Sequence, residues 1–140
     1  MLDTSVLIAA FYQPLHRPCF SREVYDYLVE NESVHLSPYI LQEFREKCIK
    51  KLKMTAHDVG RLESLIKAKT HLEKGGPVQW TPPEHFVRRD IKDVPIVELA
   101  LSISADLLLS WDKDLRSLKK VQMTLILSPS EFWNRLNTSL

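Results

Sequence analysis

Four acidic residues from separate parts of the chain are candidates for binding a divalent cation: Asp3, Glu43, Asp93 and Asp112. Asp3 and Asp112 each follow a short apolar stretch that is typical of a buried strand, and functional groups gather beyond the carboxyl ends of parallel strands. Asp93 precedes an apolar helical segment, and Glu43 lies one turn into another helical segment. Ligand sets made only of oxygen suit Mg²⁺ or Mn²⁺ better than Zn²⁺, and the five histidines show no zinc-ligand spacing. The sequence therefore allows a magnesium or manganese site.

Each of these acids also has a purely structural explanation. Asp3 and Asp93 are suitable N-caps for the helices expected after them. Asp112 and Asp114 are also common turn residues. Glu43 lies at the edge of an apolar helical stripe, where a solvated or ion-paired glutamate is the usual case. Spacing and periodicity alone leave these explanations open.

The segments that carry the acids alternate between helical and extended patterns. Helices are expected after Asp3 and over residues 20–30, 37–52, 55–72, 94–105 and from 128 onward. Three of them begin with capping signals, at Ser37-Pro38, Thr55 and Ser128-Pro129. Strands are expected at residues 1–2, 34–36, 78–80, 107–110 and 124–127. Because two residues make a poor strand, residues before Met1 are expected to be missing. The alternation predicts an α/β sandwich with a mainly parallel central sheet.

The composition is that of an ordinary globular domain. The chain has 140 residues, 44% of them hydrophobic and 26% charged, which predicts a single domain over residues 1–140. The net charge of +1 excludes a polyelectrolyte tail but allows opposite charges to be sorted onto different faces. Two cysteines without CxxC spacing favour a reduced intracellular protein. No apolar run reaches the ~18 residues of a membrane span, and no signal peptide is visible, so the cytoplasm is the expected location.

Five segments, in order along the chain, resemble the motifs of the PIN-domain nucleases, in particular the toxin subfamily related to VapC. They are Leu2-Asp3-Thr4-Ser5-Val6-Leu7, Ser37-Pro38-Tyr39-Ile40-Leu41-Gln42-Glu43, residues 89–100 (RDIKDVPIVELA), residues 105–115 (ADLLLSWDKDL) and Ser128-Pro129-Ser130-Glu131-Phe132. The first four carry the candidate acids, and the last matches the usual ending of the family. The resemblance spans nearly the whole chain.

The resemblance implies an α/β/α sandwich of the PIN type and divalent-metal-dependent hydrolysis of RNA phosphodiester bonds. One or two Mg²⁺ or Mn²⁺ ions would be held by Asp3, Asp93 and Asp112, with Glu43 as an outer ligand or a positioner of the attacking water. Residues expected to support these acids are Thr4, Ser5, Asp90, Ser110 and Asp114. The resemblance also implies a homodimer and, for a toxin, a protein antitoxin that occupies the active-site groove.

Two departures from the family pattern bear on activity. Ser5 stands where the family prefers Asn, which is expected to weaken the orientation of Asp3. Trp111 stands where a small Gly usually precedes the last aspartate, and its indole is expected to obstruct the substrate or to stack on a base. An alternative is therefore a catalytically impaired PIN-like domain that serves as an RNA- or protein-binding module.

Basic residues flank the acidic motifs. One group shares the helix of Glu43 and comprises Arg45, Lys47, Lys50, Lys51 and Lys53. A second group lies near the later motifs and comprises Arg88, Arg89, Lys113, Arg116, Lys119 and Lys120. Such runs are commonly a solvated helix face, but beside an acidic site they are candidates for gripping RNA phosphates.

Two other α/β families with acidic sites fit the sequence poorly. A phosphotransfer receiver domain needs paired acids near the first strand and a lysine after the last strand. A haloacid-dehalogenase-like phosphatase needs an Asp-x-Asp motif, but Ser5 occupies the second acidic position.

Overall fold

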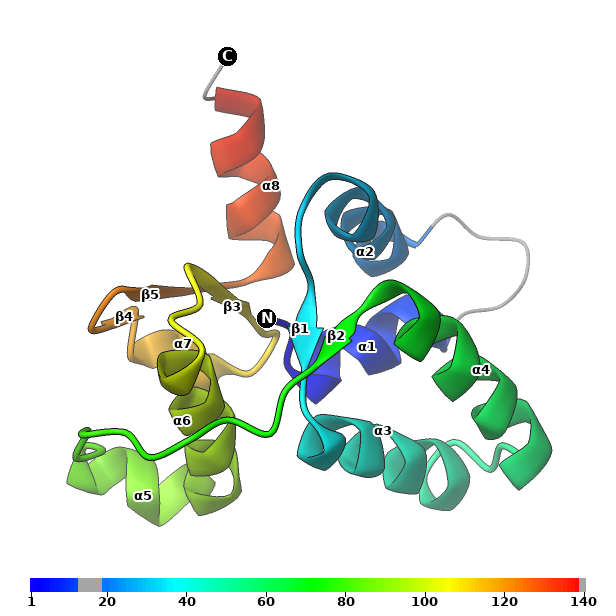
Figure 1. Cartoon of the computed structure of the whole chain (residues 1–140), viewed down its shortest axis with the longest axis horizontal. Coiled ribbons are helices and arrows are strands. Elements are labelled where there is room, and N and C mark those ends of the chain that lie inside the picture. Colours follow the sequence, from blue (N-terminus) through cyan, green and yellow to red (C-terminus); the bar gives the residue numbers. More distant parts are fainter. Residues whose placement is uncertain (13–18, 139–140) are drawn as a thin grey trace.

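The computed structural model describes residues 1–12 and 19–138 and has a mixed α/β fold with two small sheets (Figure 1). The elements follow in the order α1 (Thr4–Phe11), α2 (Phe20–Asn31), β1 (His35–Leu36), α3 (Pro38–Lys50), α4 (Ala56–Lys69), β2 (His71–Leu72), α5 (Glu84–Asp90), the 3-10 turn η1 (Ile91–Asp93), α6 (Val94–Ser102), β3 (Leu107–Leu109), α7 (Lys113–Ser117), β4 (Lys120–Val121), β5 (Thr124–Leu127) and α8 (Pro129–Thr138). The predicted α/β class is confirmed. The PIN-type sandwich stays a prediction.

The two sheets contain mostly parallel pairs. Strands β1 and β2 pair in parallel, with His35 opposite His71. The second sheet has the order β3-β5-β4, in which β3 and β5 are parallel and β4 is an antiparallel edge strand. The sequence predicted one central sheet, whereas the described structure has two short sheets.

The N-terminal residues extend the second sheet beyond β3. Leu2 forms a parallel bridge with Leu109. The backbone N–H of Asp3 donates to the Leu109 carbonyl at 2.9 Å, and the N–H of Leu109 donates to the Met1 carbonyl at 3.0 Å. This pairing brings Asp3 to the carboxyl end of β3, where Ser110 follows.

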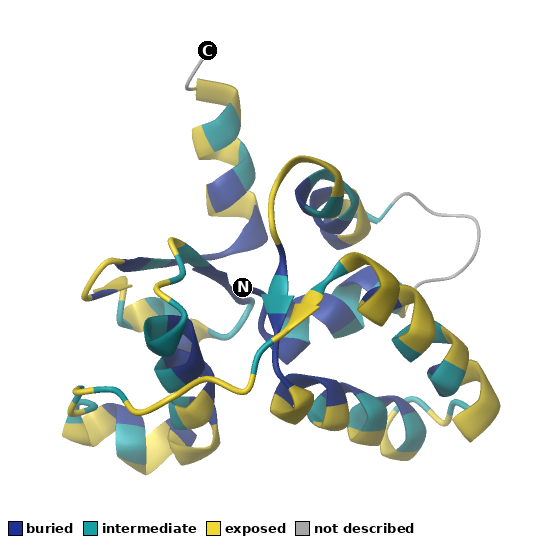
Figure 2. Ribbon diagram, viewed as in Figure 1, coloured by how far each residue is buried: buried dark blue, intermediate teal, exposed yellow. Residues whose placement is uncertain are grey.

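The core is one cluster of apolar side chains between these sheets and the helices. Its largest fully buried members include Leu2, Leu7, Leu36, Ile40, Phe44 and Phe86. Helix α1 packs against both α2 and α3, and Figure 2 shows it as a largely buried element, whereas α4 and α5 carry long exposed faces. The sequence segment that begins at Asp3 is therefore held at the centre of the molecule.

Three helix starts form as their capping signals predict. The Ser37 hydroxyl accepts from the N–H of Ile40 at 3.0 Å, with Pro38 in the first turn of α3. The Thr55 hydroxyl accepts from the N–H of Asp58 at 3.1 Å. At α8, Ser128 and Glu131 form a reciprocal capping box with distances of 3.0 and 3.1 Å. These caps fix where α3, α4 and α8 begin.

Three local predictions are wrong. Residues 78–80 form no strand, because no described strand pairs with them; the Gln79 carbonyl instead accepts from the Gln122 side-chain amide at 2.9 Å. The helix predicted to reach residue 72 ends earlier, because α4 stops at Lys69. Residues 71–72 instead form strand β2, which pairs with β1. Helix α6 ends at Ser102 instead of residue 105, and Ser104 adopts a left-handed φ of 52° that stops the helix.

The short elements α5, α7 and β4 have no counterpart in the sequence prediction. Cys19 and Cys48 are free thiols. Among the described helices, none has both the length and the apolar character needed to cross a membrane.

Candidate metal centre

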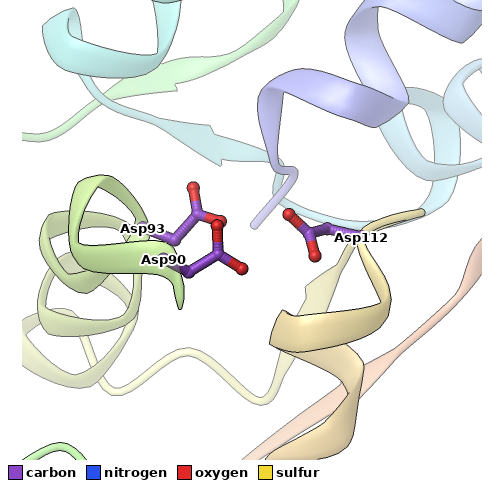
Figure 3. Close-up of side chains that lie close together, drawn as sticks. All are labelled: Asp90, Asp93 and Asp112. Carbon is purple, nitrogen blue, oxygen red and sulfur yellow. The ribbon is translucent and has the colours of Figure 1, made fainter. Parts of the chain in front are cut away.

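Three aspartates lie together at the junction of α5, η1 and α7. Asp90 ends α5, Asp93 ends η1, and Asp112 is the N-cap of α7. Each offers one carboxylate oxygen within 4.8 Å of the others. Figure 3 shows Asp90 and Asp93 side by side, with Asp112 facing them from the start of α7. The structure thus brings together two of the four predicted acids and adds Asp90, which the sequence suggested only as a supporting residue.

Asp3 lies at the same edge of the sheet and is the most firmly held of the acids. Its Oδ2 accepts from the hydroxyls of Ser110 at 2.7 Å and Ser5 at 2.9 Å, and its Oδ1 accepts from the N–H of Thr4 at 2.7 Å. Its charge contributes to the raised pKa of Asp93. Asp3 is therefore electrostatically part of the cluster. Ser5 and Ser110, which were predicted to support the acids, both donate hydrogen bonds to its carboxylate.

Glu43 joins the cluster through Thr4. The Thr4 hydroxyl donates a short hydrogen bond to the Glu43 carboxylate, and the charge of Glu43 helps to raise the pKa of Asp3. Helix α3 begins at Pro38, so Glu43 projects from its second turn toward the start of α1. The four predicted acids thus meet in one region, with Glu43 set back behind Thr4.

Burial and mutual repulsion perturb these carboxyl groups. Burial, followed by the charges of Asp3, Asp90 and Asp112, raises the pKa of Asp93 to about 8. Burial is also the largest cause of the raised pKa values of Asp3 and Asp90. At neutral pH the cluster therefore retains a proton that a bound cation would displace. Strongly perturbed carboxyl groups of this kind are typical of functional sites.

Tyr39 is a member of the site that the sequence did not single out. It precedes Glu43 by four residues and so shares its face of α3. Its hydroxyl donates to the Lys92 carbonyl at 2.6 Å, which ties α3 to η1. Burial, then the charges of Glu43 and Asp93, raise the Tyr39 pKa. The four-residue spacing is the signal that points to this residue.

The two departures from the family pattern have structural consequences. The Ser5 hydroxyl donates to Asp3 and accepts from the N–H of Trp111 at 3.0 Å, so a serine does orient the aspartate. The Trp111 indole N–H donates to the Ser21 hydroxyl at 2.9 Å, and its ring contacts Phe20. The indole is therefore anchored on α2; whether it obstructs the substrate or stacks on a base stays a prediction.

Asp114 supports Asp112 and also acts on the cluster of three, because its charge is among the causes, after burial and the charge of Asp112, that raise the Asp90 pKa. Its backbone N–H donates to Asp112 Oδ1 at 2.8 Å, and its carboxylate lies 3.7 Å from the Arg89 guanidinium. The contact from its N–H fixes the Asp112 side chain at the start of α7.

The predicted RNA-binding residues of α3 lie along the helix away from the acids. Arg45 is paired with Glu63 of α4 at 2.7 Å. Lys47 is half-buried, and Lys50, Lys51 and Lys53 are exposed at the end of the helix. Because an α-helix rises ~1.5 Å per residue, Lys50 lies about 10 Å along the axis from Glu43.

The acidic cluster is the one group of three or more metal-ligating side chains found among the described residues. Of the five histidines considered as zinc ligands, His16 lies outside those residues. Comparison of the chain with protein-family models found no match, and comparison with curated proteins found none.

Proposed function

We propose that this chain is a divalent-metal-dependent endoribonuclease and the toxin component of a toxin–antitoxin pair. The convergence of Asp90, Asp93 and Asp112 with Asp3 is the observation that carries the nuclease proposal. The ordered resemblance to PIN-domain nucleases adds the substrate class, the PIN-type sandwich, the homodimer and the antitoxin partner.

The donor set fits Mg²⁺ or Mn²⁺. All the converging ligand atoms are carboxylate oxygens, which hard divalent cations prefer. In addition, Asp90 Oδ2 is buried and has no hydrogen-bond partner among the described residues. Such an acceptor is costly when left unsatisfied, and a cation would satisfy it. Asp93 and Asp112 would hold the ion together with Asp3 or Asp90.

Several residues of the chain would have separate roles in hydrolysis. A cation held by the carboxylates would lower the pKa of a water molecule and would neutralise charge that develops on the phosphate. Ser5 and Ser110 hold Asp3 in one orientation, and the N–H of Asp114 does the same for Asp112. Glu43, restrained by Thr4, would position the attacking water and accept its proton.

The test is RNA cleavage by purified protein with Mn²⁺ or with EDTA. Wild-type protein is expected to cleave only with Mn²⁺, and Asp112→Asn is expected to lose nearly all activity while remaining folded. Asp58→Asn, which changes an exposed aspartate on α4, is the matched control and should cleave like wild type. Cleavage that persists in EDTA, or equally in Asp112→Asn, would contradict the metal mechanism. Metal binding without cleavage of any RNA would instead indicate a binding module.

A further inference from the structure

A second charged site lies beside α7, in a cavity of about 510 Å³ that is lined by residues of α7, β4, β5 and α8. We call it the α7–α8 pocket. Its cationic lining residues are Lys113, Arg116, Lys119, Lys120 and Arg135. Glu131 is the acidic residue in the lining, and its carboxylate already accepts from the N–H of Ser128 at 3.1 Å. The pocket is therefore strongly cationic.

The local chain conformation gathers these cations. Helix α7 carries Lys113 and Arg116, and the chain then turns sharply into β4. Lys119 makes this turn with a left-handed φ of 59°, and the N–H of Lys120 donates to the Leu118 carbonyl at 2.6 Å. Four cations from eight consecutive residues consequently border one cavity.

Arg116 has unused hydrogen-bonding capacity in this pocket. Its guanidinium donates to the Trp111 carbonyl at 3.4 Å, a long contact. Its Nε is buried and has no acceptor within residues 1–12 and 19–138. A planar guanidinium is suited to phosphate oxygens, and because Nε is buried, Arg116 would offer them its terminal nitrogens.

The pocket begins at the metal centre. Lys113 directly follows Asp112, and α7 rises only about 6 Å from Lys113 to Ser117. An anionic chain whose reacting phosphate lies at Asp112 would therefore reach the cations of the pocket with its neighbouring phosphates.

The cavity beside α3 is a weaker candidate for the same role. It measures about 590 Å³ and is lined by Arg45, Lys50 and Lys67 but also by Glu46 and Glu63. Three cations there face two carboxylates, one of which is paired with Arg45. In the α7–α8 pocket, even without Arg135, the four cations Lys113, Arg116, Lys119 and Lys120 face one carboxylate. The charge balance favours the α7–α8 pocket for a polyanion.

We infer that the α7–α8 pocket binds the sugar–phosphate backbone of the RNA beside the reacting phosphate, and that the α3 lysines contribute little. This inference rests on the proposed ribonuclease function. Contacts of this type position a nucleic acid without reading its bases, so binding should depend on salt and hardly on sequence.

The test measures binding in EDTA, where the proposed cleavage is blocked. The probe is a fluorescein-labelled single-stranded RNA of about 12 nucleotides, followed by fluorescence anisotropy over a range of salt concentrations. The variant K113Q/K119N/K120Q removes three exposed lysines of the pocket. Asparagine is used at position 119 because it tolerates a positive φ. The variant K50Q/K51Q/K53N is a close match, since it also removes three exposed lysines and Lys53 has a φ of 58°.

We expect the pocket variant to bind at least ~10-fold more weakly and to lose about 2 units of salt slope, given a slope of ~0.7 per phosphate contact. The α3 variant should change affinity less than ~2-fold. Equal losses in the two variants, no loss in the pocket variant, or no binding by wild type would overturn the inference. Because binding is read without metal, a pocket-specific loss in a protein that never cleaves RNA would refute the nuclease proposal and leave the pocket assignment standing.

Discussion

Replacement of Asp93 by asparagine should stabilise the metal-free protein at neutral pH. The Asp93 pKa is about 8, against an ordinary value of 3.8. Between these values the unfolded carboxyl is ionised while the folded one keeps its proton. The contribution of Asp93 to stability is therefore most favourable below pH 3.8 and is lost as the pH rises toward 8. At ~1.4 kcal/mol per pH unit, the loss by pH 7 is about 4 kcal/mol if Asp93 alone carries it.

The stability that Asp93→Asn is expected to gain is smaller than this upper limit of about 4 kcal/mol. Asp93 titrates together with Asp3, Asp90 and Asp112, so the penalty is shared among them. The asparagine amide stays neutral and can donate to the Asp90 carboxylate. We expect Asp93→Asn to recover about 2 kcal/mol, or about 6 °C in Tm for a chain of this size.

Thermal and urea unfolding in EDTA between pH 5 and 8 measures this effect. Wild-type stability should decline across the range, and the decline should be shallower in Asp93→Asn, with Asp58→Asn following wild type. Added Mn²⁺ should raise the Tm of wild type but hardly that of Asp93→Asn. A less stable Asp93→Asn protein at pH 7, or parallel pH profiles, would refute the electrostatic reasoning.

Four further outcomes are expected. Mn²⁺ binding at pH 7 should release about one proton, because metal displaces the proton of the cluster; calorimetry in buffers of different ionisation enthalpy measures it. Ser110→Ala should weaken Mn²⁺ binding by about 10–100-fold in the same calorimeter, with unchanged circular dichroism, because Asp3 loses a 2.7 Å hydrogen bond. Gly75→Ala should lower the free energy of unfolding in urea by about 1–2 kcal/mol, because Gly75 has a φ of 74° and a Cβ would lie 2.8 Å from Leu99 and Ser102. Gly76→Ala is the control and should be nearly neutral, because a Cβ at position 76 would meet open space. Trp111→Phe should lose about 1 kcal/mol with its bond to Ser21 and show no faster RNA cleavage, whereas faster cleavage would support the obstruction hypothesis.

The sequence predicted the parts of the site that depend on local signals. Asp3 and Asp112 follow apolar runs, and the cap at Ser37 places Glu43 on its helix, so these positions could be found without a structure. Asp90 was harder to find, because its place beside Asp93 depends on the 3-10 turn that joins α5 to α6. Strand β2 was missed for a related reason: its two residues are exposed and become a strand only through β1, a partner distant in sequence.

The hydrogen bond between Ser110 and Asp3 joins residues that are 107 positions apart. Closing a loop of that length carries an entropic cost of about 4 kcal/mol from the length-dependent term alone, and contacts so distant in sequence slow folding. The centre is therefore complete only once Asp3 and Ser110 have met across a loop of that length. A chain still being synthesised has no complete carboxylate cluster until Asp112 has been added, so the nuclease we propose could not act before that point in its synthesis.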